Sequence, residues 1–328
     1  MRTRAALFRA PGTPLQLADV ELEEPGTEDV LVRLAAVGIC GSDLHVVRGE
    51  WPRPTPMILG HEGCGEVEWV GAEVTRVRPG QRVIIALTPV CNRCWFCLRN
   101  ETHLCELWPT VLGTQRARRT DGSTANAMSG VGSFADVMTV HEASCIPVET
   151  DLPSDQLALI GCGFTTGFGA AVNTAPVTPG ATVAVIGCGG VGLSAIMIAS
   201  ALGASVVSID ISEEKLEFSK SVGAAAVVNA AQVEDVAEAV REVTGGAGAH
   251  VSVDALGSPS TLFNSISCLR KRGKHVQVGL LGGEERFPPV PINRVVGYEL
   301  EILGSHGMQA FKYREMLEMI RRGKLHPE

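Results

Sequence analysis

Two patterns of hydrophobic and polar positions divide the chain near residue 165. After Pro179, short apolar runs alternate with segments that carry helix start signals, such as Ser212 and the pair Ser258-Pro259. Such runs are typical of strands buried on both faces of a parallel sheet. We predict strands at Thr182–Ile186, Val206–Ile209, Ala226–Val228, His250–Asp254, His275–Gly279 and Leu300–Leu303. Strands separated by helices in this way predict a doubly wound α/β sheet.

The first half of the chain has a different pattern. Prolines and glycines separate short β-rich runs such as Val30–Val37 and Gln81–Ala86, which is typical of a compact unit with frequent turns. We expect a first domain over residues 1–163, a second, α/β domain over 164–303, and a last segment over 304–328. A helix is predicted at Gln309–Arg322 within this last segment.

The composition narrows the class of protein. Of 328 residues, 45% are hydrophobic and 20% are charged, which is ordinary for a globular chain with a core. The net charge of −8 argues against nucleic acid or an anionic membrane surface as a partner. The sequence shows no run of about 18 apolar residues that would predict a transmembrane helix. Ten cysteines are too few for a disulfide scaffold but enough for metal sites, so we expect a cytoplasmic protein with reduced thiols.

A glycine-rich motif follows the first predicted parallel strand. Gly187-x-Gly189-x-x-Gly192 comes directly after this strand and opens an apolar helix. Gly187 permits a tight turn, Gly189 lets a pyrophosphate approach the backbone, and Gly192 allows the helix to pack closely on the strand. The helix N-terminus supplies N–H groups and partial positive charge. With Asp210 ending the next strand 18 residues after Gly192, the pattern predicts dinucleotide binding.

Asp210 also bears on the choice of cofactor. A carboxylate at this position can accept hydrogen bonds from a free ribose diol and repels a 2′-phosphate, so NAD is favoured over NADP. Asp210 can alternatively be a simple strand-end cap. Lys215, in the following turn, either reaches the ribose or remains solvated.

Four cysteines lie close together in the first half, at Cys91, Cys94, Cys97 and Cys105. Two-residue spacers let thiolates converge on one ion and a short loop returns the fourth, which describes a structural, tetrahedral Zn²⁺ site. An iron–sulfur cluster is the main alternative, but the last spacer does not match its usual run. We expect His103 to be solvated rather than a ligand.

A second candidate metal site is dispersed along the chain. Its members are Cys40 in GICGSDLH, His61 and Glu62 in LGHEGCGEV, and Cys162 in IGCGFTTGFGA. Glycines flank the cysteines and the histidine, which suits backbone crowded around a bound group. A lone cysteine is usually a small buried apolar residue, so spacing alone leaves this site undecided.

These motifs occur in the order of a known family. GICGSDLHVVRG, ILGHEGCGEV, the four-cysteine segment, GCGFTTGFGA and GCGGVGLSAIM together span nearly the whole chain. The chain resembles the zinc-dependent medium-chain alcohol dehydrogenases and is closest in pattern to their liver-type branch. The resemblance implies a GroES-like β-rich catalytic domain over 1–163, a six-stranded NAD-binding Rossmann domain over 164–303, and two Zn²⁺ per chain, one catalytic and one structural. It also implies that the segment 304–328 returns to the catalytic domain and that a C-terminal tail is missing after it.

The resemblance also implies roles around the catalytic zinc. Cys40, His61 and Cys162 resemble its ligands, with a fourth position open to water or substrate. Asp43 resembles the carboxylate that orients the ligand histidine, although it can also be a helix N-cap. Glu62 resembles a glutamate behind the zinc that becomes a transient ligand.

A proton path is implied as well. Zinc favours alkoxide over alcohol, so the alcohol proton must leave the site. Ser42 resembles the hydroxyl that passes this proton through the cofactor ribose to His45 near solvent. The alternative interpretations are an N-cap serine and a surface histidine.

Other positions complete the implied site or depart from the family pattern. The nicotinamide contacts correspond to Thr166, Val191 and Val278, and the substrate pocket to Trp51, Leu87 and Met128. This pocket is bulky and uncharged, which suits apolar alcohols or aldehydes. Gly41 stands where many relatives place a basic residue on the pyrophosphate, and Pro109 about where the glutathione-dependent formaldehyde branch has a substrate-binding arginine. We expect the basic run Arg116, Arg118 and Arg119 to be a solvated loop.

These observations predict an NAD- and zinc-dependent alcohol dehydrogenase that transfers hydride reversibly between a small alcohol and NAD. The alternative within the superfamily is a polyol, threonine or specialised biosynthetic aldehyde or ketone reductase, and Cys162 argues for the alcohol branch. A non-catalytic sensor that binds zinc and NAD is the alternative of another class. Because Leu300–Leu303 is expected at the outer edge of the sheet, we also predict pairing with a second copy, and the resemblance implies a homodimer or homotetramer.

Overall fold

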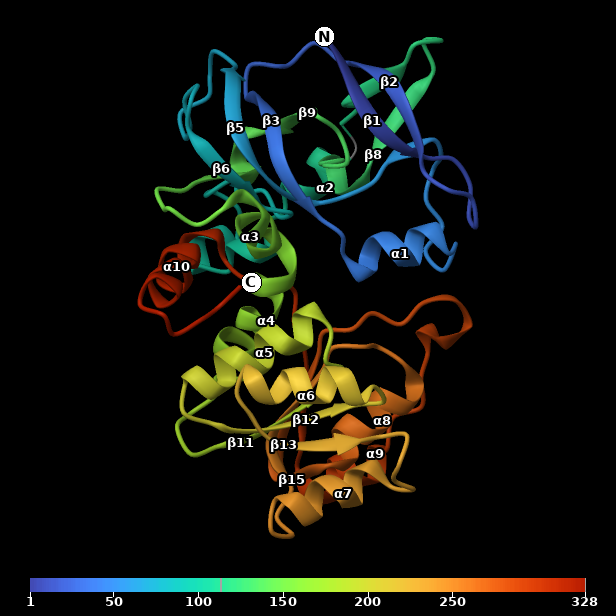
Figure 1. Cartoon of the computed structure of the whole chain (residues 1–328), viewed down its shortest axis with the longest axis vertical. Helices are drawn as coiled ribbons and strands as arrows, with labels where there is room; N and C mark the ends of the chain where they lie inside the picture. The colour runs from blue at the N-terminus through green and yellow to red at the C-terminus, as the bar shows by residue number, and fades with distance from the viewer. Residues whose placement is uncertain (113, 328) are drawn as a thin grey trace. The chain divides into compact units, whose positions relative to one another are not determined.

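The computed structural model describes residues 1–112 and 114–327, which form two units, Met1–Cys162 and Gly163–Pro327 (Figure 1). The segment 304–327, which we expected to return to the first domain, groups with the second unit. Each unit has its own sheets and its own apolar core.

The first unit is built almost entirely of strands. An antiparallel sheet has the order β10-β6-β5-β3-β9, and a closed barrel has the order β1-β2-β7-β8-β4. In β3, Val30 and Val32 are buried and Arg33 is exposed, so alternate residues face the core. The strands are β1 (Arg2–Phe8), β2 (Gln16–Leu22), β3 (Asp29–Gly38), β4 (Met57–Ile58), β5 (Glu62–Val70), β6 (Arg82–Ile85), β7 (Ala117–Arg119), β8 (Thr124–Ala127), β9 (Val137–His141) and β10 (Cys145–Pro147).

Short helices connect these strands. They are α1 (Gly41–Val47), α2 (Trp108–Leu112) and α3 (Ser154–Leu159). Helix α1 begins directly after Cys40, whose backbone N–H donates to Oδ2 of Asp43 over 2.9 Å. Asp43 therefore satisfies one of the N–H groups that a helix start leaves unpaired.

The arginines predicted to form a solvated loop lie on or beside strand β7, so that prediction was wrong. Arg116 is 5% exposed, and its Nη1 donates to Oδ1 of Asp29 over 2.6 Å. Arg118 donates through Nε and Nη2 to the two carboxylate oxygens of Glu23, at 2.7 and 2.5 Å. Arg119 ends β7. The acceptors lie far away in the sequence, and a basic run gives no local sign of them.

The second unit contains one parallel six-stranded sheet, in the order β13-β12-β11-β14-β15-β16. Its strands are β11 (Thr182–Ile186), β12 (Ser205–Asp210), β13 (Ala224–Asn229), β14 (Ala249–Asp254), β15 (Leu269–Gln277) and β16 (Glu301–Gly304). The six predicted strands are confirmed, and the doubly wound α/β class with them. Val207 and Ile209 of β12 are buried on one face of the sheet with Ala184 and Ile186 of β11.

Strand β15 departs most from its prediction at His275–Gly279. It begins at Leu269, which pairs with Ala249 of β14, and regular pairing resumes only at Lys274 after an irregularity in register. It ends at Gln277, because the N–H groups of Val278 and Gly279 both donate to the carbonyl of Asp254. Gly279 lies so close to the backbone of Gly257 that a Cβ there would be 2.3 Å from its nitrogen.

Helices pack on both faces of this sheet in Figure 1. The helices of this unit are α4 (Thr165–Phe168), α5 (Gly190–Ala201), α6 (Glu213–Ser221), α7 (Val236–Val243), α8 (Pro259–Ser267), α9 (Ile292–Tyr298) and α10 (Tyr313–Arg321). Both predicted caps are confirmed: Ser212 accepts from the N–H of Lys215, and Ser258 from that of Thr261. Helix α10 starts later than predicted because Ala310–Lys312 forms a 3₁₀ turn before it.

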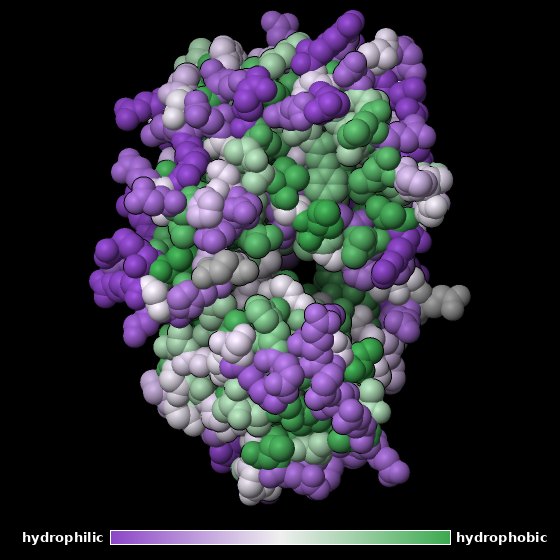
Figure 2. All heavy atoms as spheres, in the orientation of Figure 1, coloured by the Kyte–Doolittle hydropathy of each residue, from purple (hydrophilic) through white to green (hydrophobic). Residues whose placement is uncertain are grey.

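One helical run, Ser154–Thr174, is long and apolar enough to cross a membrane by length and composition, although the sequence predicted no such run. Its most apolar stretch of 18 residues has a mean hydropathy of 1.3, and 61% of that stretch is buried within the protein. This burial is what the core helix of a globular domain requires. On the face drawn in Figure 2, hydrophilic and hydrophobic side chains are interspersed over both units.

Candidate functional site

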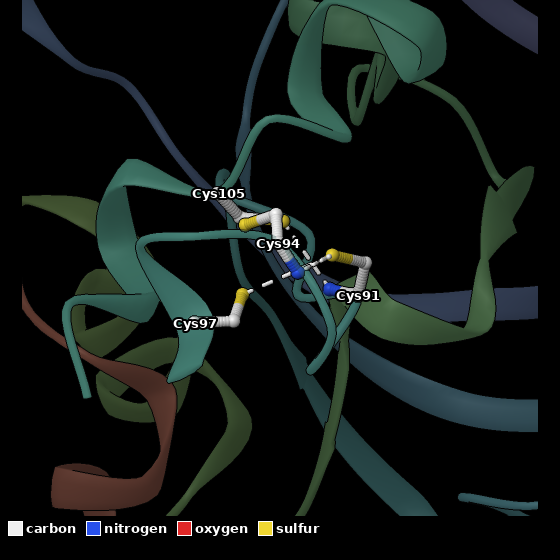
Figure 3. A group of neighbouring side chains, drawn as sticks. All are labelled: Cys91, Cys94, Cys97 and Cys105. Carbon is white, nitrogen blue, oxygen red and sulfur yellow. Dashed lines mark hydrogen bonds between the residues drawn. The ribbon is translucent and has the colours of Figure 1, made fainter. Parts of the chain in front are cut away.

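The four-cysteine segment folds into a single lobe in which the side chains of Cys91, Cys94, Cys97 and Cys105 converge (Figure 3). Their sulfur atoms all lie within 4.8 Å of one another, and the Sγ atoms of Cys91 and Cys97 are 3.9 Å apart. Tetrahedral Zn–S bonds of about 2.3 Å place neighbouring sulfurs about 3.8 Å apart, so the lobe fits one Zn²⁺. An iron–sulfur cluster would hold the thiolates farther apart, because iron and sulfide atoms lie between them.

Backbone groups hold this lobe in shape. The N–H of Cys94 donates to Sγ of Cys91, and the N–H groups of Cys91 and Leu107 donate to Sγ of Cys105. Backbone N–H groups, that of Glu106 first, lower the pKa of Cys94 to about 6. Such bonds stabilise thiolate, the form that binds a metal.

The dispersed residues also come together. Cys40, His61, Glu62 and Cys162 place their ligand atoms within 4.8 Å of one another. Cys40 precedes α1, His61 and Glu62 stand at the start of β5, and Cys162 lies in the π-helical segment Ile160–Phe164. His61 and Glu62 are 2% and 3% exposed. The convergence that spacing left undecided is therefore present in the fold.

Glycines allow the backbone to crowd this group. A Cβ at Gly38 would lie 2.0 Å from Oε2 of Glu62. A Cβ at Gly161, next to Cys162, would lie 2.7 Å from the carbonyl oxygen of Ile85. Position 161 therefore requires glycine, because the clash there is with backbone, whereas a side chain at position 38 would displace the carboxylate of Glu62.

Asp43 joins the loops that carry Cys40 and His61. Its Oδ1 accepts from the N–H of Gly60 over 3.0 Å, its Oδ2 accepts from the N–H of Cys40, and Oδ1 lies 3.6 Å from Nδ1 of His61. Among the described residues, this buried Nδ1 has no hydrogen-bond partner, and Asp43 is the carboxylate beside it. Asp43 is thus both a helix cap and the group that turns the ring of His61.

The charges in this group support metal binding. A hydrogen bond with Cys162 is the largest cause that lowers the pKa of Cys40 to about 4, with His61 adding to it against the effect of burial. Burial by itself lowers the pKa of His61, but Asp43 and Cys40 outweigh it and raise this pKa to about 10. Because Nδ1 faces Asp43, Nε2 is the nitrogen left for an ion. Two sulfurs, one nitrogen and one carboxylate around one point are the donors that Zn²⁺ accepts.

The predicted relay residues lie on α1. Ser42 and His45 are both half-buried. Nδ1 of His45 pairs with Oε2 of Glu50, and its ring stacks on that of Trp51 with centroids 4.5 Å apart and an interplanar angle of 19°. No sequence motif marked Glu50; a carboxylate just past the helix that carries His45 was the available signal.

The predicted pocket residues divide into two groups. Trp51 and Met128 pack on one apolar cluster that also contains Phe8 and Leu59. Leu87 lies two residues after β6 and is half-buried.

The glycine turn in the second unit has the predicted shape. Gly187 adopts a left-handed φ of +95°, and a Cβ at Gly192 would lie 1.7 Å from its carbonyl oxygen. Gly189 precedes α5, and a Cβ there would meet nothing within 4 Å, so the turn is open to a ligand. The N–H groups at the start of α5 are available to an anion.

Asp210 lies at the end of β12, beside this turn. Its Oδ2 accepts from the N–H of Cys188 over 2.7 Å, and its Oδ1 accepts from those of Ile211 and Ser212. Asp210 therefore does cap the end of β12, and the same hydrogen bonds hold its carboxylate next to the glycine turn. Lys215 is exposed. The residues predicted at the nicotinamide, Thr166, Val191 and Val278, are each half-buried.

Comparison with known proteins finds matches in both units. Residues 26–150 match the family model for the alcohol dehydrogenase GroES-like domain, and residues 190–322 match that for zinc-binding dehydrogenases. A solved NAD-dependent alcohol dehydrogenase is 32% identical to the chain, with a TM-score of 0.81 over 98% of this chain and 90% of that one. The chain belongs to the zinc-binding alcohol dehydrogenase family. Its two units are the GroES-like and nucleotide-binding domains of that family.

Two other solved members of the zinc-binding alcohol dehydrogenases match the chain along its full length. An alcohol dehydrogenase zinc-binding domain protein from Burkholderia ambifaria is 29% identical, with a TM-score of 0.92, and 90% of it is covered. Benzyl alcohol dehydrogenase from Acinetobacter calcoaceticus is also 29% identical, with a TM-score of 0.90, and 91% of it is covered.

Proposed function

We propose that the protein is an NAD- and zinc-dependent alcohol dehydrogenase that interconverts an alcohol with its aldehyde or ketone. The observation that carries this proposal is the group formed by Cys40, His61 and Cys162, with Asp43 beside His61 and Glu62 within the same 4.8 Å. Two cysteines and one histidine are the established zinc ligands of alcohol dehydrogenases. The second zinc belongs in the four-cysteine lobe, and this lobe supports placement near the liver-type branch.

The protein's own residues hold the reactants and move the proton. Zn²⁺ would supply Lewis acidity, and nicotinamide would accept or return the hydride. Asp43 fixes Cys40 and His61 so that the ligand atoms keep their positions. Oγ of Ser42 takes the proton of the alcohol, and Nε2 of His45 is the atom from which the proton reaches solvent.

Asp210 supports NAD rather than NADP. Its carboxylate lies beside the glycine turn, where it accepts from ribose hydroxyls and repels a 2′-phosphate. A relative from Sinorhizobium meliloti, 26% identical, was solved bound to NADP, so both cofactors belong in the test. We expect Asp210→Ser to weaken NAD and to improve use of NADP.

The substrate class follows from the predicted pocket. Trp51 and Met128 share one apolar cluster, which favours apolar or aromatic alcohols over sugars and phosphorylated compounds. The relative named benzyl alcohol dehydrogenase supports benzyl alcohol as the first substrate to test.

A substrate panel tests the proposal. Purified protein of known zinc content is given NAD or NADP with benzyl alcohol, butanol, sorbitol or threonine, and NADH formation is followed by absorbance. We expect NADH with benzyl alcohol, loss of turnover and of one zinc in Cys162→Ser, and retained turnover in Cys145→Ala, which removes a buried thiol outside both groups. Faster oxidation of sorbitol or threonine would select the alternative reductase, and NAD binding without turnover of any substrate would select the sensor.

We further propose that the chain assembles as a homodimer or homotetramer. Strand β16 stands at the end of the strand order, and its Ile302 is 43% exposed. An apolar edge of this kind pairs with a second copy. Light scattering is expected to give a multiple of the chain mass, and a stable monomer would contradict this assembly.

A further inference from the structure

Immediately after helix α1 the chain turns back over His45. The N–H groups of Glu50 and Trp51 both donate to the carbonyl oxygen of His45, at 2.9 and 3.3 Å. Gly49 makes this reversal possible because it adopts a left-handed φ of +77°. The two residues are therefore held beside His45 by the backbone, whatever their side chains do.

The side chains of Glu50 and Trp51 both contact the imidazole of His45. Oε2 of Glu50 pairs with Nδ1 of His45, and the indole of Trp51 stacks on the imidazole. The side chains of His45 and Glu50 are 30% and 41% exposed, so the pair lies at the surface, where a proton can be exchanged with water. The imidazole is thus constrained at one nitrogen and on one face.

A carboxylate only accepts hydrogen bonds, so its partner Nδ1 must carry a hydrogen. In neutral imidazole the other nitrogen, Nε2, then has the free lone pair. We propose that Glu50 is a positioning residue that fixes this tautomer of His45, so that Nε2 is always the nitrogen that takes the proton, while Trp51 holds the plane of the ring. This inference rests on the proposed function, in which His45 is the last protein group on the proton path.

A neighbouring histidine has the same kind of arrangement. Asp43, also on α1, faces Nδ1 of His61 and leaves its Nε2 for an ion. Helix α1 therefore carries Asp43, which orients His61, and it also carries His45, which Glu50 in the following turn orients. The alternative for Glu50 is a surface ion pair, which contributes about 0–1 kcal/mol to stability and nothing to turnover.

Three variants separate these interpretations. Glu50→Ala removes the acceptor, and we expect kcat for alcohol oxidation to fall about tenfold, since general acid–base groups contribute about 100-fold or more. Glu50→Gln keeps a carbonyl oxygen that can accept from Nδ1, so most of kcat should be rescued. Glu68→Ala is the matched control, because Glu68 forms a surface ion pair with Arg33 on β3 and should leave kcat unchanged.

Coupling to His45 provides the decisive comparison. The double variant Glu50→Ala with His45→Gln should be no slower than His45→Gln alone, because Glu50 acts only through the ring. The proposal would be overturned if the two substitutions lowered kcat multiplicatively in the double variant, or if wild type and Glu50→Ala had equal kcat.

Nitrogen-15 NMR of the histidine side chains keeps this test independent of turnover. Wild type should show His45 with hydrogen on Nδ1, and Glu50→Ala should show a mixture of tautomers. The opposite tautomer in wild type overturns the inference about Glu50. A wild type that shows the expected tautomer but oxidises no alcohol refutes the proposed function instead.

Discussion

Substitution of Gly192 by alanine is expected to force helix α5 away from the turn that precedes it. The new Cβ would lie 1.7 Å from the carbonyl oxygen of Gly187, whereas real Cβ atoms essentially never come closer than 3.0 Å to another heavy atom. The turn and the helix must therefore separate by more than an ångström. Gly187 has little room to move, because the side chain of Leu256 packs against it. A Cβ placed on Gly187 would lie only 2.6 Å from Cγ of Leu256.

The size of the effect follows from this displacement. Overpacking of this kind lowers the free energy of unfolding by about 1–3 kcal/mol. The same movement shifts the N–H groups at the start of α5, which the proposed function assigns to the pyrophosphate. We expect NADH to bind about tenfold more weakly or worse, which corresponds to at least about 1.4 kcal/mol.

Denaturant unfolding and fluorescence titration with NADH measure the two effects. Gly190→Ala is the matched control for stability, because a Cβ at Gly190 would meet no protein atom within 4 Å. Since Gly190 is the first residue of α5, alanine there should raise stability by up to about 1 kcal/mol. Unchanged stability and unchanged NADH affinity in Gly192→Ala would refute the close-packing argument.

Three further predictions concern stability and metal content. Burial lowers the pKa of His275 from 6.5, so the unfolded chain binds this proton more tightly than the folded protein does. At pH values below about 6.5 the free energy of unfolding should therefore decrease, by up to about 1.4 kcal/mol per pH unit. Urea titrations should show a weaker pH dependence in His275→Gln. Arg116→Ala leaves Asp29 without its buried partner and should lower that free energy by about 2–3 kcal/mol, against about 0.5 kcal/mol for the exposed Arg118→Ala; equal losses would contradict the burial argument. Cys105→Ser should remove one zinc, seen by metal analysis, and lower Tm, while full zinc content would exclude the four-cysteine site.

The parallel sheet was predictable because its strands are apolar on both faces, and its glycine turn because each glycine meets a steric demand. The cap at Ser258 was also predictable, since it depends on residues within three positions. Strand β15 was only partly recognised, because exposed polar residues and a register shift separate its first residue, Leu269, from the apolar run that was predicted.

The functional residues show the same limit. The four cysteines lie in one short segment, so their spacing alone indicated a metal site. The group around His61 needs residues about 100 positions apart, and the motifs indicated it only through resemblance to a family. The partner of Arg116, Asp29, is 87 positions away, and local sequence could not reveal such a contact.

The four cysteines lie close together in the sequence, whereas Cys40 and Cys162 lie far apart, so the two groups should assemble at different stages of folding. The four-cysteine lobe closes a loop of 14 positions between Cys91 and Cys105, so its closing entropy is small and the lobe can take its ion before the sheets exist. Cys40, His61 and Cys162 meet only when strand β5 has paired and the chain has reached the end of the first unit. We therefore expect the lobe to bind its metal early in folding, and the second group to bind metal only once the first unit has folded.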